Sequence, residues 1–283
     1  MESIIQTIVN NKVQVLTSTI VVLAGAKLLS SFFKKEPVYE RDIVYIYDFP
    51  QSSMPVIHSS PFVLKVITFM RYANIPYKVI NSMENGPRAK KPFIRYNGEL
   101  VSDSQNIIEF LTEKFNVTSL KLKDEQQEAE AHLLRRYIDD AFYWSLVYSR
   151  WCDPVFSPVA VRGMLAGVPP MLFGIISRIA KSAVGKQLYN AGIGRCPREE
   201  IYSVAVKDVN SIAKRLGDSQ FLFNDKLSVV DISLFSMLVQ LYYAIEPTPI
   251  SKAIKSNKNL VDYIERIQNI FKPCDFVCSS RSA

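Results

Sequence analysis

Two short groups of residues could do chemistry where predicted helices begin. Ser59-Ser60 directly precedes Pro61 and an apolar helical pattern, and Asp103-Ser104 stands at the start of another predicted helix. A hydroxyl at a helix N-terminus can donate a hydrogen bond to an anionic atom, because that end of the helix favours negative charge. Either group could equally serve only as a helix cap, since Ser and Asp are preferred N-cap residues.

A third group, Lys91-Pro92, stands directly before a predicted strand. If the Lys91–Pro92 bond is cis, the backbone N–H and C=O of Lys91 are free to pair with a peptide-like ligand. The alternative is a trans proline at a sheet edge. Tyr47, on an earlier predicted strand, is a further hydroxyl donor, and His58 is either a ligand contact or an ordinary packing residue.

The cysteines argue against thiol and metal chemistry. None of the four forms a C-x-x-C pair, and they are Cys152, Cys196, Cys274 and Cys278. A redox dithiol, a zinc site and a disulfide framework are therefore not expected. Soft metals need several thiolates together, so we predict no metal site and a reducing environment.

Composition excludes two further classes. Hydrophobic residues make up 48% of the 283, which supplies a large core and rules out a disordered chain. The net charge is +7, from 34 basic and 27 acidic residues, but the basic residues are scattered without interleaved aromatics. Nucleic acid is therefore not a predicted partner.

The first half of the chain alternates strand and helix. A buried β-branched run predicts the first strand, helical spacing behind Ser60 predicts the first helix, and the turn dipeptide Asn97-Gly98 predicts a hairpin. The predicted elements are strand Ile43–Phe49, helix Ser60–Ala73, strand Tyr77–Asn81, hairpin strands Phe93–Tyr96 and Glu99–Val101, and helix Ser104–Phe115. The order β-α-β, then β-β-α, is that of a thioredoxin-like domain.

Beyond Asp124 the pattern is helical throughout. The predicted helices are Glu125–Tyr148, Val159–Val184, Glu199–Leu216, Ser228–Tyr243 and Leu260–Phe271. The second should break near Gly167 and Pro169-Pro170, because interior prolines remove a backbone donor. Ser228 and Asp231 have the spacing of a capping box. The sequence thus predicts an all-α C-terminal domain.

An apolar segment, Val13–Phe33, precedes both domains and is close to the roughly 20 residues that cross a bilayer. Lys27 lies near one end of it and could reach the interface. We expect a spanning N-terminal transmembrane helix. A cleaved signal with Ala24-Gly25-Ala26 as its cleavage site and an amphipathic surface helix are the alternatives.

Three phrases carry a family resemblance over roughly residues 43–275. IVYIYDFPQSSMPVIHSSPFVLKVITFMR, FYWSLVYSRW and FLFNDKLSVVDISLF resemble the failed axon connections family. Its kin include the cadmium-responsive (cadmium-inducible lysosomal) proteins and, more distantly, the metaxins. A thioredoxin-like half joined to a helical half is also the plan of glutathione S-transferases. The resemblance implies an anchor and linker over residues 1–36, a thioredoxin-like domain over 37–118 and a helical domain over 119–283.

The resemblance also implies a way to activate a thiol. Transferases use a Tyr, Ser or Cys at the end of the first strand or the start of the first helix, and Ser60 occupies that place, with Ser59 and Tyr47 as alternatives. The related C-P-F/Y-C pattern has lost both cysteines here, since Val63 stands in the last position. Thiol–disulfide exchange on this loop is therefore excluded.

The same resemblance implies a binding site for glutathione. Lys91 and a cis Pro92 would pair with the peptide, Asp103 would bind the ammonium of the γ-glutamyl end, and Ser104 with its helix N-terminus would bind the carboxylate. Residues of the helical half could line a pocket for an apolar co-substrate or could simply be core: Tyr143, Trp144, Tyr148, Arg150 and Trp151.

Two functions follow from the resemblance. One is a membrane-anchored glutathione S-transferase-like protein that acts on a small electrophile in detoxification or a cadmium or other stress response. The other is a non-catalytic, metaxin-like adaptor that binds proteins at a membrane, as a homodimer or with another protein. Lys34, Lys35 and Arg41 follow the apolar segment, which predicts a single-pass protein with a cytosol-facing domain. The membrane is either lysosomal or another endomembrane, or the mitochondrial outer membrane.

Overall fold

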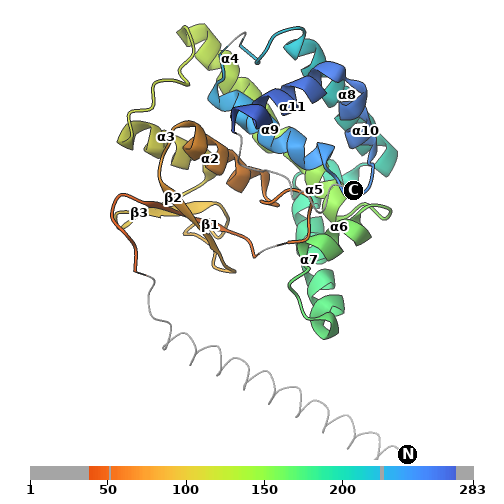
Figure 1. The fold of residues 1–283 in the computed structure, drawn as a ribbon. Coiled ribbons are helices and arrows are strands. Elements are labelled where there is room, and N and C mark those ends of the chain that lie inside the picture. The colour runs from red at the N-terminus through yellow and green to blue at the C-terminus, as the bar shows by residue number, and fades with distance from the viewer. Residues whose placement is uncertain (1–37, 51, 224–225, 272–283) are drawn as a thin grey trace, which may run out of the picture. The chain divides into compact units, whose positions relative to one another are not determined.

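The computed structural model describes residues 38–50, 52–223 and 226–271, and residues 41–283 form one compact unit (Figure 1). The predicted membrane segment, residues 13–33, lies outside the described residues. Among the described helices, none has both the length and the apolar character that crossing a membrane requires.

A four-stranded sheet and two helices make up the first half of the compact unit. Its elements are β1 (Val44–Asp48), α2 (Pro61–Tyr72), β2 (Tyr77–Asn81), β3 (Phe93–Tyr96), β4 (Glu99–Ser102) and α3 (Ser104–Lys114). The sheet order is β2-β1-β3-β4, with β1 parallel to β2 and antiparallel to β3. Asn97 and Gly98 both have positive φ, 46° and 91°, as a two-residue hairpin turn requires. The predicted thioredoxin-like fold is confirmed.

The two faces of the sheet have different coverings. Val44, Ile46 and Ile94 join a core cluster with residues of α2 and α3. On the other face Tyr47 stacks on Phe93, with ring centroids 4.1 Å apart. Alternate residues of a strand point to opposite faces, so Tyr47 points away from the helices.

The rest of the described chain is helical. Its elements are α4 (Glu125–Arg136), the π-helix η1 (Tyr137–Phe142), α5 (Tyr143–Trp151), α6 (Ser157–Met164), α7 (Pro170–Asn190), the 3-10 turn η2 (Ile193–Arg195), α8 (Arg198–Leu216), α9 (Val229–Tyr242), α10 (Pro249–Ser256) and α11 (Lys258–Ile270). Helix α9 is buried over nearly its whole length and packs against α2 (Figure 1). The helices of both halves therefore share one core.

Three helix predictions can be compared with the structure. The break before Pro170 and the capping box are confirmed, and the Asp231 carboxylate accepts hydrogen bonds from the Ser228 N–H (2.9 Å) and hydroxyl (2.5 Å). The helix predicted over 125–148 is found as α4, η1 and α5 in direct succession. Its middle part, η1, is a π-helix, which the sequence did not predict and which contributes Ile138 and Phe142 to the core. Helix α10 was not predicted.

Candidate functional site

The sheet register brings the predicted site residues to one end of the sheet. Tyr47 pairs with Phe93 at the start of β3, and Phe93 pairs with Ser102 at the end of β4. The N–H of Asp103 donates to the C=O of Pro92 at 3.3 Å. Helix α2 begins at the same end, because it follows β1 and leads back to the parallel strand β2. We call five residues at this end the candidate site: Ser60, Lys91, Pro92, Asp103 and Ser104.

The Lys91–Pro92 peptide bond is cis, as the resemblance to transferases implies. Among the described residues, no hydrogen bond is made to the backbone N–H or C=O of Lys91. A backbone donor and acceptor on one residue can pair with an extended peptide, as an added strand does. The loop before β3 can therefore bind a short peptide through its main chain.

The Lys91 side chain has a separate, structural role. Its Nζ donates to the C=O of Asp48 at 2.7 Å and also to the C=O of Ser82, and it lies 4.8 Å from the centre of the Phe49 ring. Burial lowers the pKa of Lys91, while nearby Asp48 and Glu84 oppose that lowering. This ammonium ties the end of β1 to the loop after β2, so only the backbone of Lys91 is presented to a ligand.

Asp103 and Ser104 form the start of α3. The Oδ1 atom of Asp103 accepts hydrogen bonds from the N–H groups of Gln105 (3.0 Å) and Asn106 (3.4 Å). Asp103 has a φ of 81°, which is uncommon for a residue with a side chain and often marks functional positions. The hydroxyl of Ser104 is hydrogen-bonded to no group of the described chain. The capping role of Asp103 is thus real, and it uses one of two carboxylate oxygens.

Ser60 is the N-cap of α2, and its Oγ accepts a hydrogen bond from the Val63 N–H at 3.4 Å. Pro61 is the first helical residue, where its missing N–H costs nothing. Ser60 is half-buried, so its hydroxyl lies at the edge of the site. The cap geometry leaves the hydroxyl proton available to donate to an anion at the helix N-terminus.

The loop before Ser60 is held by the helical half of the chain. Arg150 of α5 donates from Nη1 to the C=O of Ser59 at 2.7 Å and from Nη2 to Oε1 of Gln240 at 2.5 Å. Gln240 of α9 donates in turn to the C=O of His58 at 2.6 Å. Burial lowers the pKa of Arg150 to about 10, while Tyr143 opposes that lowering. The position of Ser60 therefore depends on two side chains from the other half.

His58 lies within this loop and faces β1 rather than a ligand. Its Nδ1 is 2.7 Å from Oδ2 of Asp48, and both side chains are buried. The contact fixes the loop against the strand end. Of the two interpretations of His58 made from the sequence, packing is the one its surroundings match.

A second buried polar cluster joins α2, α3 and η1. Lys65 of α2 donates from Nζ to Oδ2 of Asp139 at 2.8 Å and to Oε1 of Gln105 at 3.2 Å. Arg135 lies 3.4 Å from the same Asp139 oxygen. Burial lowers the pKa of Lys65, and the charge of Asp139 opposes this. The cluster holds α2, whose N-cap is Ser60, against α3 and η1.

Sequence reasoning did not identify Lys65, Asp139 or Gln240 as important. A signal for two of them exists, since Lys65 interrupts the apolar face of α2 and Gln240 lies in the mostly apolar second half of α9. An isolated polar residue in an apolar helix predicts a buried partner. Asp139 lies in η1, where helical periodicity fails.

The aromatic residues proposed for a co-substrate pocket are partly buried and contact one another. The Tyr143 ring lies 4.7 Å from that of Phe62 and 5.3 Å from that of Trp144. Tyr148 packs edge-on against Tyr202 of α8 at 5.9 Å. Burial raises the pKa of Tyr143, with nearby Arg150 opposing. Phe62 and Tyr143 thus place aromatic surface close to the start of α2.

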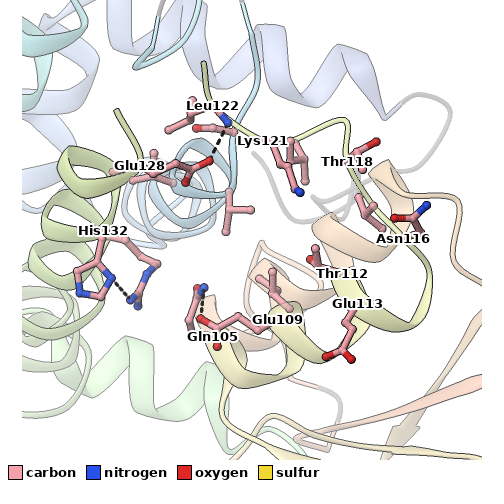
Figure 2. Close-up of a pocket in the computed structure, with 18 residues that line it drawn as sticks. Gln105, Glu109, Thr112, Glu113, Asn116, Thr118, Lys121, Leu122, Glu128 and His132 are labelled. Carbon is pink, nitrogen blue, oxygen red and sulfur yellow. Dashed lines mark hydrogen bonds between the residues drawn. The ribbon is translucent and has the colours of Figure 1, made fainter. Parts of the chain in front are cut away.

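A groove of the described chain lies elsewhere, between α3, α4 and the start of α9, with a volume of about 590 Å³ (Figure 2). Its polar groups bind one another: Glu128 accepts from the Leu122 N–H, and Gln105 donates to Glu109. No residue of the candidate site lines this groove. Within the described residues no group of three or more His, Cys, Asp or Glu could hold a metal ion.

Two family descriptions match this chain. "Glutathione S-transferase N-terminal domain" matches residues 61–156, and "Glutathione S-transferase, C-terminal domain" matches residues 205–267. The candidate site residues from Pro92 to Ser104 lie within the first match.

Three curated proteins are similar over most of this chain. The isoprene-epoxide–glutathione S-transferase of Rhodococcus sp. (strain AD45) is 29% identical over 74% of this chain and 91% of its own length. Failed axon connections of Drosophila melanogaster is 28% identical over 85% of this chain, which spans 61% of that longer protein. Metaxin-2 of Mus musculus is 23% identical over 72% of this chain and 80% of its own length.

Solved structures confirm the fold. The beta-etherase LigF from Sphingobium sp. strain SYK-6 superposes with a TM-score of 0.59 over 82% of this chain and 99% of that one, at 16% identity. A glutathione S-transferase of Ceriporiopsis subvermispora, solved in complex with glutathione, superposes with a TM-score of 0.53 over 82% of this chain and 98% of that one, at 16% identity.

Proposed function

Because this chain is a glutathione S-transferase-like protein related to Failed axon connections and metaxin-2, we propose that it binds glutathione at the candidate site and is attached to a membrane through residues 13–33. The observation that carries the glutathione part is the cis Lys91–Pro92 bond beside a backbone N–H and C=O with no described partner. Glutathione is a short peptide, so the main chain of its cysteinyl unit can form a pair of hydrogen bonds with the backbone of Lys91, as neighbouring β-strands do.

The start of α3 would hold the γ-glutamyl end of glutathione. The carboxylate of the γ-glutamyl unit would accept a hydrogen bond from the Ser104 hydroxyl. It would lie at the N-terminus of α3, where negative charge is favoured. The carboxylate oxygen of Asp103 that does not cap α3 would accept from the ammonium group. The ammonium and the carboxylate of the γ-glutamyl unit would thus each meet a partner of opposite charge or polarity.

Ser60 would activate the thiol. Its hydroxyl, at the N-terminus of α2, would donate to the glutathione sulfur and favour the thiolate over the thiol. The thiol proton would pass to solvent, and the thiolate would then attack a carbon of a small electrophile. With an epoxide, the carbon–sulfur bond forms as the ring C–O bond breaks, and the resulting alkoxide takes up a proton from solvent. Similarity to an isoprene-epoxide–glutathione S-transferase favours an epoxide or similar electrophile, and the resemblance to cadmium-responsive proteins favours detoxification under stress.

A non-catalytic, metaxin-like adaptor is the second candidate. It is favoured by the relation to metaxin-2 and by the segment from Ser82 to Lys90, which forms turns without a helix. The buried Lys91 ammonium fastens that segment to β1 and so narrows the space for the glycyl end of a peptide. In this reading the fold presents surfaces to proteins, as a homodimer or with another protein, and glutathione does not bind.

Calorimetry with glutathione separates the two candidates. Residues 37–283 should bind it, and Asp103→Ala should weaken binding by about 1.5–3 kcal/mol, the worth of a hydrogen bond to a charged group. Asp124→Ala is the matched control, because Asp124 also caps a helix, α4, by accepting from the Gln127 N–H at 2.9 Å, and it lies outside the candidate site. Both variants should lose about 1 kcal/mol of stability with the cap.

Only Asp103→Ala should lose affinity for glutathione. Equal affinities in the two variants would remove Asp103 from the site, and no heat of binding in the unmutated protein would leave the adaptor as the better account.

A further inference from the structure

Helix α7 has an apolar stripe that the described chain leaves uncovered. Met171, Ile175 and Ile179 recur every four residues and are 91%, 60% and 65% exposed, and Leu172 beside them is 46% exposed. Residues four apart lie on the same helix face. Single exposed apolar residues are ordinary, but a contiguous stripe marks a site of interaction.

The opposite face of α7 attaches the helix to the rest of the protein. Leu188 is buried, a Cβ at Gly185 would lie 3.8 Å from Sγ of Cys152, and Lys181 donates to Oγ of Ser157 at 2.9 Å. Helix α7 runs beside α5 and α6 at the lower end of the helical half (Figure 1). Helix α7 is therefore attached to the protein through one face, and the apolar stripe stays exposed.

The charge of this region has one sign. Between Pro154 and Pro197 the sequence contains no Asp or Glu. The basic residues of the same stretch are Arg162, Arg178, Lys181, Lys186 and Arg195, and all but Lys181 are exposed. Arg178 and Lys186 lie on α7 itself. The apolar stripe therefore lies in a stretch of chain whose charged residues are all basic.

We propose that this α7 face, made of Met171, Leu172, Ile175, Arg178, Ile179 and Lys186, docks on the surface of an anionic lipid bilayer. An exposed apolar stripe with Lys and Arg beside it is the composition of helices that lie in the membrane interface. The side chains of Met171, Ile175 and Ile179 enter the boundary between headgroups and acyl chains, and the basic groups pair with lipid phosphates and anionic headgroups.

Helix α7 lies on the membrane rather than across it. Arg178, Lys181 and Lys186 are spread along it, and no described helix meets the requirements of a span. A docking protein partner is the competing occupant, and the one-signed charge favours the bilayer, whose cytosolic surface is uniformly negative. The inference uses neither residues 13–33 nor the glutathione site, so it goes beyond the proposed function.

Vesicle co-sedimentation of residues 41–283 tests the proposal. This compact unit holds the complete sheet and all described helices and lacks the predicted anchor. It should sediment with vesicles of phosphatidylcholine mixed with phosphatidylserine, bind much more weakly to phosphatidylcholine alone, and dissociate at high salt. Each basic residue at an anionic surface contributes about fivefold in affinity, so Arg178→Gln with Lys186→Gln should reduce binding about thirtyfold.

Matched substitutions on α8 give the controls. Val204 is 54% exposed on α8, and Lys207 and Lys214 are exposed on the same helix. Ile175→Asp with Ile179→Asp should abolish vesicle binding, whereas Val204→Asp should not, and Lys207→Gln with Lys214→Gln should weaken binding far less than the α7 pair. Circular dichroism checks that each variant is folded.

Equal binding to neutral and anionic vesicles, equal effects of the α7 and α8 variants, or no vesicle binding at all would each overturn the proposal. The last result would leave a protein as the occupant of the α7 face.

Discussion

Ser60 can serve as a helix cap and as a thiol-activating donor at the same time. Its oxygen accepts from the Val63 N–H through a lone pair, and a hydroxyl keeps its proton for a second partner. Capping and catalysis are therefore not alternatives at this residue. The sequence left open whether Ser60 does more than cap the helix, and a measurement of activity answers that question.

Ser60→Ala should reduce the rate of thiol transfer on the order of 10²-fold, as loss of one donor to a reacting anion does. It should also cost about 1 kcal/mol of stability through the lost cap. The measurement is the rate of conjugation of glutathione with a small epoxide, alongside a denaturant titration. Ser59→Ala is the control, since Ser59 is held by its backbone C=O.

An unchanged rate in Ser60→Ala together with a reduced rate in Ser59→Ala would transfer the role to Ser59. Tyr47 is placed less well for it, because its ring is stacked on Phe93 on the face of the sheet turned away from α2.

The local chemistry of single residues was readable from the sequence where it depends on neighbours along the chain. The caps at Ser60 and Asp103 follow from short patterns and are found, and the cis bond at Pro92, which the resemblance to transferases implies, is found as well. The buried roles of Lys91 and Arg150 were not predicted, because their partners are distant in sequence: Asp48 for the first, Ser59 and Gln240 for the second.

At the level of elements, the Lys65–Asp139 pair connects the first helix to the helical half. Side-chain exposures of 1% and 11% place it in a poorly hydrated interior. Breaking such a pair by removing one partner is costly, because the other charge stays buried. The pair therefore stabilises the α2–η1 contact only while both members are present.

Asp139→Asn should lower the free energy of unfolding by about 3 kcal/mol near neutral pH. The pKa of Lys65 is already lowered by burial, and loss of the opposing Asp139 charge should lower it further. The unfolded chain then binds a proton that the folded chain lacks, so stability rises with pH up to the ordinary Lys value of 10.5. The deficit of the variant should thus shrink between pH 7 and pH 10, as measured by urea titrations.

The control for this prediction is Asp140→Asn. It removes an acidic residue of the same π-helix and breaks that residue's exposed pair with Arg136 (2.7 Å) at the end of α4. Exposed pairs contribute little, so its cost should stay below about 1 kcal/mol at every pH. A deficit of Asp139→Asn that grows with pH would contradict the account of Lys65 as a buried charge.

Strong periodicity explains which elements could be predicted. The predicted β2 and β3 have the observed bounds, β4 and α3 differ by one residue at one end, and β1 and α2 differ by one residue at each end. Helix α10 has only eight residues, too few for a periodic signal, although Thr248 caps it and Pro249 begins it. The π-turn at 137–142 keeps a helical composition, so the sequence alone cannot distinguish it from an α-helix.

For the whole molecule, membrane orientation stays a prediction from the sequence. Basic residues after the apolar segment predict a cytosol-facing domain. The structure adds that the sequon Asn116-Val117-Thr118 follows α3, with Asn116 exposed and at a φ of 49°. Such a turn would be accessible to glycosylation in a luminal domain.

The full chain inserted into sealed membranes should therefore show no mobility shift after glycosidase treatment. Protease added to vesicles with the cytosolic face outward should digest the domain. A glycan at Asn116, or complete protection from protease, would place the domain in the lumen.

The contacts of Arg150 and Gln240 with the loop before Ser60 bear on how this chain can evolve. Two-domain proteins are often recombined as modules, but here the loop that presents the serine is anchored by side chains encoded far downstream. A hybrid gene that joined this thioredoxin-like half to the helical half of a paralogue lacking both residues would leave the carbonyls of His58 and Ser59 without donors. Inheritance of the two halves is thereby coupled, and a change in one half selects for compensating changes in the other.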